Sequence, residues 1–313
     1  MPFAVTHINL WAIEDGDGWS IVDTGVQDPA TYEAWRTLFD GPLKDRPVTR
    51  VLLTHMHPDH SGMAGWITRK FDCDLWMTRL EYLTCRVLCA DVGIEAPDRA
   101  IRFYREAGWN DGAIDIYRMR FGDFGRHIHA FPDSFRRLQD GDRFIIGNFE
   151  WRVIVGRGHS PEHACICCDE LGLFISGDQV LPRISSNVSV FPTEPDADPV
   201  ADWSASISKL ECEVPDDVLV LPSHNEPFRN LHARLDYLRV SQERSLDRVL
   251  STLIEPKRVV DLFVSLFSRD VAADPLHLNL ATGETIALLN HLLGRGEIEK
   301  RQDEAGVGWY SRV

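Results

Sequence analysis

The sequence predicts an α/β fold, and two features of the chain carry that prediction. Short apolar runs typical of buried strands recur at residues 51–53, 75–77, 151–155, 173–175 and 218–221. Stretches with helical character lie between or after them, at residues 29–39, 201–212 and 228–253. Residues able to bind metal ions follow several of these runs, so their side chains are expected to converge on one point.

The N-terminal part of the chain is expected to form two paired strands. Residues 3–13 and 19–22 have strand character, and a turn-rich loop at residues 14–18 joins them. Met1-Pro2-Phe3-Ala4-Val5 has no basic region and no long apolar core, so no signal peptide is expected.

The segment Thr54-His55-Met56-His57-Pro58-Asp59-His60 follows a predicted strand and holds three histidines and one carboxylate. Neutral imidazole and carboxylate groups suit zinc and similar divalent ions. His55 and His57 are two residues apart and can point the same way from an extended backbone. Asp59 and His60 are adjacent to each other, so we expect them to serve a second metal ion beside the first. A helix is expected to begin at Gly62, directly after this loop.

This segment resembles the metal-binding signature of the metallo-β-lactamase-fold hydrolases. Three later segments resemble the other ligand motifs of that family, in the same order: Gly158-His159-Ser160-Pro161-Glu162-His163, Ser176-Gly177-Asp178 and Pro222-Ser223-His224. The resemblance covers about residues 3–250 and implies an αββα sandwich with a dinuclear metal centre. The implied ligands are His55, His57 and His159 for one ion, Asp59, His60 and His224 for the other, and Asp178 as a bridge.

The resemblance also implies supporting roles. Asp23 is expected to lie beneath the metal site, although a turn capped by Asp23 fits the sequence equally well. His163 is expected to support the site rather than bind metal. Arg183 either meets an anionic substrate group or is a surface arginine. Asp59 is the candidate catalytic residue, because it could orient a water molecule or pass a proton.

The implied function is hydrolysis by a hydroxide that bridges two divalent ions, with zinc expected and iron or manganese as alternatives. The β-lactamases proper carry a cysteine ligand, and no cysteine lies near Asp178. Lactonases of the family place a tyrosine shortly after the bridging aspartate, and residues 179–190 contain none. We therefore expect a thioester substrate of the acyl-CoA or glutathione type, as in the glyoxalase II-like branch. The alternatives are a lactone or ester hydrolase, an endoribonuclease-like phosphodiesterase, and a metal-binding regulatory protein without activity.

Residues 78–137 differ in character from the rest of the chain. They contain ten arginines, no lysine and many aromatic residues, with few strand signals. Because the segment is too long for a simple connection between strands, we expect a helical insertion that forms a lid over the metal site. Its arginines could meet an anionic small molecule that carries an acyl group. The alternative is a helical layer with core aromatics and solvated arginines.

Residues 255–313 are expected to form a small winged-helix-like segment after a catalytic domain of residues 1–254. A helix at 284–293 and two strands at 298–300 and 308–312 support this expectation. The segment has seven basic and nine acidic residues, a difference of −2. We therefore expect it to serve packing or homodimer formation rather than DNA binding.

Charge and cysteine content limit the function further. The net charge of the 313-residue chain is −15, which disfavours a nucleic-acid partner. No apolar run approaches the roughly 20 residues of a membrane span. Seven cysteines, an odd number without a secretion signal, fit a reducing cytoplasm. Cys165, Cys167 and Cys168 are expected to be core residues of a strand.

Overall fold

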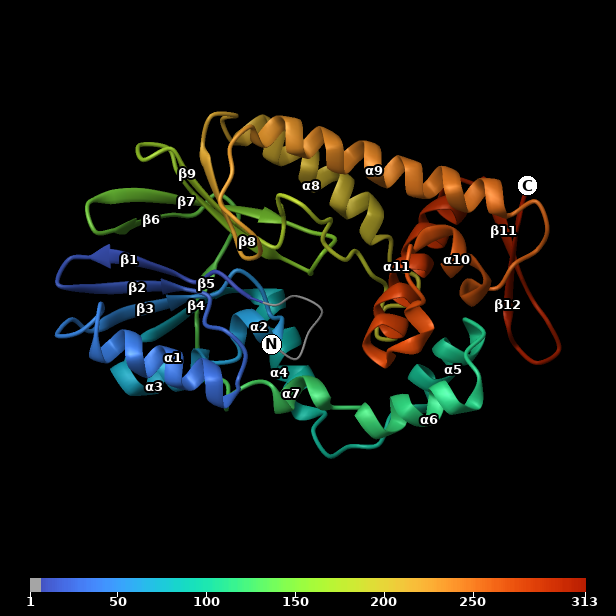
Figure 1. Ribbon diagram of the computed structural model, residues 1–313, viewed down its shortest axis with the longest axis horizontal. Helices are drawn as coiled ribbons and strands as arrows, with labels where there is room; N and C mark the ends of the chain where they lie inside the picture. The colour runs from blue at the N-terminus through green and yellow to red at the C-terminus, as the bar shows by residue number, and fades with distance from the viewer. Residues whose placement is uncertain (1–6) are drawn as a thin grey trace. The chain divides into compact units, whose positions relative to one another are not determined.

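The computed structural model describes residues 7–313, which divide into two compact units. The first unit holds the chain up to Gly93, together with Gly122–Ser186 and Lys209–Arg234. The second unit holds Ile94–Phe121, Asn187–Ser208 and Leu235–Val313. Figure 1 shows the helices and strands, coloured from blue at the N-terminus to red at the C-terminus. The domain boundary expected at residue 254 stays a prediction.

The first unit contains a five-stranded sheet with the order β1-β2-β3-β4-β5. Its strands are β1 (Trp11–Asp15), β2 (Gly18–Val22), β3 (Val48–Leu52), β4 (Asp74–Thr78) and β5 (Arg136–Leu138). β1 is antiparallel to β2, and the other neighbours are parallel. The strand expected over residues 3–13 lies partly outside the described residues, as does the segment considered for a signal peptide; in the described part, β1 begins at Trp11.

A second five-stranded sheet of the same unit has the order β10-β9-β8-β7-β6. Its strands are β6 (Arg143–Ile146), β7 (Phe149–Gly156), β8 (His163–Cys168), β9 (Leu173–Gly177) and β10 (Leu219–Pro222). Only the β9–β10 pair among these described strands is parallel. All six residues of β8 are buried, including Cys165, Cys167 and Cys168, as expected for core cysteines.

Two apolar clusters hold the first unit together. On β3, Val51 and Leu52 are neighbours that point to opposite faces of the sheet. Val51 joins Ile67 of α3 in a cluster between the sheet and its helices, and Leu52 joins Trp151 and Ile175 of the second sheet in the other cluster. Each fully buried aliphatic or aromatic side chain of this kind contributes about 1.5–3 kcal/mol of burial free energy.

Helices of the first unit pack against its sheets. Figure 1 shows α1 (Pro29–Asp40) and α3 (Ala64–Phe71) on one face of the first sheet. The last turn of α8 (Pro199–Glu213) reaches the second sheet, where Lys209 Nζ donates to the Val155 carbonyl at 3.1 Å. The predicted αββα sandwich is thereby confirmed.

The segment expected to be a helical insertion does form helices. These are α4 (Arg79–Ala90), α5 (Asp98–Glu106), α6 (Asp111–Arg120) and α7 (Asp123–Arg126). The helices α4 and α7 belong to the first unit, and α5 and α6 belong to the second. The role of the segment as a lid stays a prediction.

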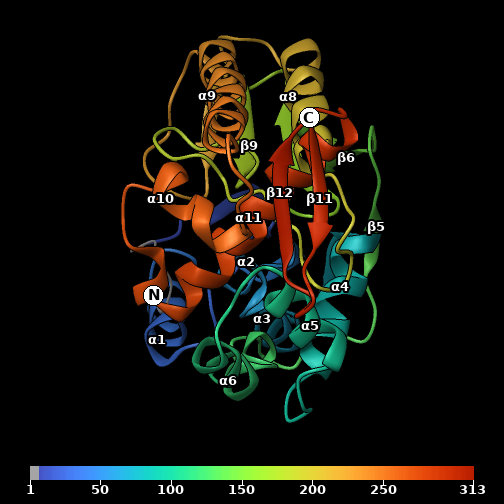
Figure 2. The ribbon, with the colours of Figure 1, turned by 90° about the vertical axis from the view of Figure 1, so that its right-hand side faces the viewer.

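The second unit ends in a long helix and a hairpin. Its C-terminal part consists of α9 (Leu231–Thr252), η1 (Val259–Leu262), α10 (Phe263–Leu266), η2 (Val271–Ala273), α11 (Pro275–Gly294), β11 (Ile298–Gln302) and β12 (Gly308–Arg312). The short helix α2 (Pro58–Ser61) of the first unit is described with the site below. Figure 2 shows the antiparallel β11–β12 pair as predicted. The helix expected at 284–293 begins earlier, because Asp274 caps it and Pro275 occupies its first position. No helix in the described part of the chain is long and apolar enough to cross a membrane.

Candidate metal centre

The first cluster of candidate ligands leaves the end of β3. His55 and His57 lie on the irregular backbone that follows the strand, and helix α2 begins at Pro58. The helix expected from Gly62 is α3, which begins at Ala64, while Gly62 itself ends the preceding short turn α2. Asp59 and His60 stand on this helical turn, so they project differently from the two preceding histidines.

The structure brings all seven expected ligands together in the first unit. Three groups have ligand atoms within 4.8 Å of one another: His55, His57 and His159; Asp59, His60 and His224; and His55, His60 and Asp178. The third group shares one residue with each of the other two. Asp178 Oδ2 lies 3.6 Å from both His60 Nε2 and His159 Nε2, and Oδ1 lies 3.5 Å from His224 Nε2. The carboxylate thus stands between the two histidine groups.

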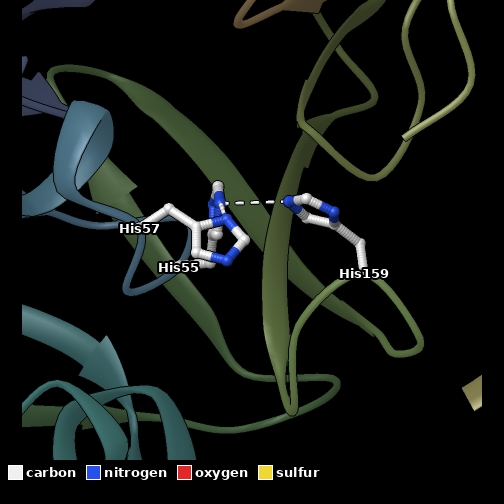
Figure 3. A group of neighbouring side chains, drawn as sticks. All are labelled: His55, His57 and His159. Carbon is white, nitrogen blue, oxygen red and sulfur yellow. Dashed lines mark hydrogen bonds between the residues drawn. The ribbon is translucent and has the colours of Figure 1, made fainter. Parts of the chain in front are cut away.

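The three-histidine group is compact. His55 Nε2 is 2.8 Å from His57 Nδ1 and 3.2 Å from His159 Nε2. Figure 3 shows His159 facing the other two histidines from a separate loop. Burial, together with the neighbouring histidines, lowers the pKa of His55 well below its usual value. Burial and His159 lower the pKa of His57 to about 3. At neutral pH His55 and His57 are therefore uncharged, and neutral imidazole nitrogens converging in this way are a donor set that fits zinc.

The second group attracts positive charge. Burial lowers the pKa of His60, but the carboxylates of Asp23, Asp178 and Asp59 outweigh it and hold that pKa well above its usual value. Burial also opposes the change at His224, where the carboxylates of Asp178 and Asp59 beside Nε2 raise the pKa to about 10. In the absence of a cation, protons on these imidazoles balance the carboxylates.

Two buried atoms of the site make no hydrogen bond to any residue of the described chain. They are His60 Nε2 and Asp178 Oδ1. A buried polar atom without a partner costs about 1–3 kcal/mol. A divalent cation between the histidines and carboxylates would satisfy both atoms, so the residues present fit the metal ions that the sequence implies.

Asp23 lies directly under the second group. Its Oδ1 accepts the Thr54 backbone N–H at 2.8 Å, and its Oδ2 accepts the Thr54 hydroxyl and His60 Nδ1, each at 2.8 Å. His163 is also fully buried, and its Nε2 accepts the Asp178 backbone N–H at 3.1 Å. Both positions suit a supporting role.

Arg183 lies at the surface. Its Nε donates to Glu226 Oε1 at 2.9 Å, and both side chains are exposed. The role of Arg183 toward an anionic substrate stays a prediction.

Sequence reasoning missed the residues that hold His224. His224 Nδ1 donates to the His7 carbonyl at 2.8 Å, and the Asn225 N–H donates to His7 Nε2 at 2.9 Å. Asn9 Nδ2 donates to the carbonyls of Pro222 at 3.0 Å and Asn225 at 2.6 Å. The only signal in the sequence was the presence of polar residues in a strand-like apolar run.

Comparison with known families agrees with this geometry. Residues 4–87 and 92–224 match the Metallo-beta-lactamase superfamily, and residues 246–313 match the Metallo-beta-lactamase-like, C-terminal domain. The chain belongs to the metallo-β-lactamase superfamily and is a metal-dependent hydrolase of that superfamily.

Three similar proteins illustrate the range of relatives. A beta-lactamase domain protein from Burkholderia ambifaria is 37% identical with a TM-score of 0.90, over 100% of this chain and 90% of that one. The probable metallo-hydrolase YqjP of Bacillus subtilis is 25% identical over 82% of this chain and 78% of that protein. The atrochrysone carboxyl ACP thioesterase of Aspergillus fumigatus is 24% identical over 82% of this chain. That match spans only 46% of the Aspergillus protein.

Proposed function

We propose that the chain is a dinuclear hydrolase. His55, His57 and His159 would hold one divalent ion, Asp59, His60 and His224 would hold the second, and Asp178 would bridge the two. The position of the Asp178 carboxylate, within 3.6 Å of histidines from both groups, is the observation that carries this proposal. Zinc suits the nitrogen and oxygen donors, and iron or manganese are compatible with them.

Divalent ions at such a site lower the pKa of water and polarise the bond to be cleaved. Asp59 is the proposed catalytic residue of the chain. Burial raises its pKa, but His60 and His224 outweigh this and hold the pKa below its usual value, so the carboxylate is ionised. Its Oδ2 lies 3.4 Å from His224 Nε2. An ionised carboxylate at this point can orient a water molecule and accept its proton.

A thioester is the proposed substrate class, of the acyl-CoA or glutathione type. Three observations support it. The Aspergillus relative is a thioesterase that acts on an acyl carrier protein, according to its name. In the sequence, no cysteine lies near Asp178, unlike in the β-lactamases proper, and no tyrosine lies within residues 179–190, unlike in the lactonases.

The test is turnover of a panel of acyl-CoA and glutathione thioesters by purified protein of measured metal content. His57→Ala is the loss-of-ligand variant. His129→Ala is the matched control, because His129 belongs to the same unit and pairs with Arg69 instead of a ligand group. Turnover that disappears only in His57→Ala supports the proposal. No thioester turnover by a protein with two bound metal ions would exclude this substrate class and direct the assay to lactones, other esters and RNA.

A further inference from the structure

A buried carboxylate joins the two loops that carry the three-histidine group. Glu81 lies in the first turn of α4, and its side chain is fully buried, whereas Leu80 and Leu83 of the same helix are exposed. Glu81 Oε2 accepts the backbone N–H of Met56 at 2.9 Å. Its Oε1 accepts the backbone N–H of Glu162 at 2.7 Å.

These two backbone groups belong to different ligand segments. Met56 stands between His55 and His57, and Glu162 lies between His159 and His163. One rigid helix therefore fixes the spacing between the loop after β3 and the loop before β8. A carboxylate suits this task, because each of its two oxygens can accept one N–H.

We propose that Glu81 is a positioning residue that holds His55, His57 and His159 at the distance required to share one metal ion. The inference rests on the dinuclear centre proposed above. It names a residue that acts through hydrogen bonds to the backbone of two loops.

The cost of keeping Glu81 in this place favours a specific role. Burying a carboxylate is unfavourable, and burial raises the pKa of Glu81 to about 7 although the N–H groups of Glu162 and Met56 oppose the change. Packing alone would be served by an apolar residue, as at Cys85 on the same buried face. Thr78 and Leu80 also hold Glu162, through its carbonyl and its side chain. Among these contacts around α4, the one that reaches Met56 comes from Glu81, and the Met56 carbonyl also accepts the Ser61 hydroxyl.

The two ligand groups should respond differently to loss of Glu81. The Asp59, His60 and His224 group has its own supports in Asp23, His7 and Asn9. A substitution at Glu81 should therefore weaken binding of the ion at the three-histidine group and leave binding of the other ion unchanged. General loosening of the fold would weaken both.

The test compares zinc binding by the wild-type chain and Glu81→Gln, using metal analysis after dialysis and competition with a chromophoric chelator. The glutamine amide offers one acceptor and points its NH₂ group at the second N–H, so one of the two contacts is lost. Glu162→Gln is the matched control: its side chain joins the loop before β8 to the start of α4, through an exposed contact to Leu80 that an amide oxygen can also make. Circular dichroism checks that each variant is folded.

We expect wild type and Glu162→Gln to bind two zinc ions, and Glu81→Gln to bind one of them at least about tenfold more weakly. Added to His57→Ala, Glu81→Gln should have little further effect. Added to His224→Ala, it should weaken the remaining ion by the same factor. If Glu81→Gln does not fold, Glu81→Asp carries the same test, because the shorter carboxylate keeps the charge but cannot reach both loops.

Equal zinc affinities in folded Glu81→Gln and wild type would overturn the inference. Equal losses in the His57→Ala and His224→Ala backgrounds would overturn it as well, because they indicate general loosening. If the wild-type chain binds fewer than two zinc ions, the proposed dinuclear centre is excluded. The inference about Glu81, which depends on that centre, is then excluded as well.

Discussion

His60 Nδ1 donates a hydrogen bond to Asp23 Oδ2 at 2.8 Å, and the two residues are 37 positions apart in the chain. This contact orients the imidazole so that Nε2 faces Asp59 and Asp178, at 3.9 Å and 3.6 Å. A carboxylate behind a metal-binding histidine fixes its ring and makes it a stronger ligand. Asp23 does so with a backbone φ of +59°, which aspartate and asparagine adopt more readily than most residues.

Replacing Asp23 by asparagine should therefore weaken metal binding without disturbing the turn. We expect Asp23→Asn to lower zinc affinity at the Asp59, His60 and His224 group by about 10–100-fold. Chelator competition measures the change. Asp45→Asn is the control, since Asp45 also has a positive φ, of +64°, but is exposed. Unchanged affinity in Asp23→Asn would show that the hydrogen bond does not tune His60.

Gly177 sits where β9 delivers Asp178 to the site. Its φ is +53°, and a Cβ there would lie 2.4 Å from His163 Cε1. We expect Gly177→Ala to lower the free energy of unfolding by about 2–4 kcal/mol, because strain and overpacking add. Gly172→Ala is the control: its φ of +60° is similar, but no atom lies within 4 Å of the added carbon. Urea denaturation should give a clearly smaller loss for Gly172→Ala, and equal losses would contradict the clash.

Glu284 gives the second unit a pH-dependent stability. Burial raises its pKa from 4.5 to about 7, although Asn187 and Arg248 oppose the change. Between these values the folded chain keeps a proton that the unfolded chain has lost, so stability falls as the pH rises through this window. Glutamine does not titrate, and its amide oxygen can still accept from Asn187 Nδ2, which donates to Glu284 at 3.0 Å.

Wild type should therefore lose about 2 kcal/mol of unfolding free energy between pH 5 and pH 8 that Glu284→Gln does not lose. The Glu284 side chain is half-buried, and its remaining contact with solvent makes the loss smaller than the full pKa shift implies. Urea denaturation of both proteins at the two pH values measures it. A difference between the proteins that does not change with pH would contradict the assignment.

Asn9 should matter for the metal site as well as for stability. Asn9→Ala leaves the carbonyls of Pro222 and Asn225 without their donor, at a cost of about 1–3 kcal/mol. It should also weaken zinc binding, because the same residues hold the loop of His224. Asn290→Ala is the control, since Asn290 also donates to two carbonyls, those of Pro195 and Ala197. Both variants should unfold more easily in urea, but only Asn9→Ala should change zinc affinity. A parallel change in Asn290→Ala would refute the link to His224.

The convergence of the seven candidate ligands could be predicted because they follow apolar strands in short, dense motifs. His159, Asp178 and His224 could be placed near the loop after β3 because their motifs resemble the later ligand motifs of the metallo-β-lactamase-fold hydrolases. The αββα sandwich followed from the resemblance that those motifs carry.

The supporting contacts could not be predicted, because they join residues distant in sequence. His7 meets His224 across 217 positions, and Glu81 meets Glu162 across 81. No local pattern encodes such pairs. The start of α11 was missed for another reason: polar residues such as Thr282 occur in its first half and are buried through partners such as Trp109, so apolar spacing does not reveal the helix there.

The hydrogen bonds by which His7 and Asn9 hold the loop of His224 have a consequence for biosynthesis. On the ribosome, His224 is the last of the seven proposed ligands to leave the exit tunnel. Its imidazole is oriented only when His7, synthesised 217 positions earlier, returns to it. The complete centre is therefore a late product of translation, and a chain that stalls before residue 224 lacks the one proposed ligand that completes the Asp59, His60 and His224 group.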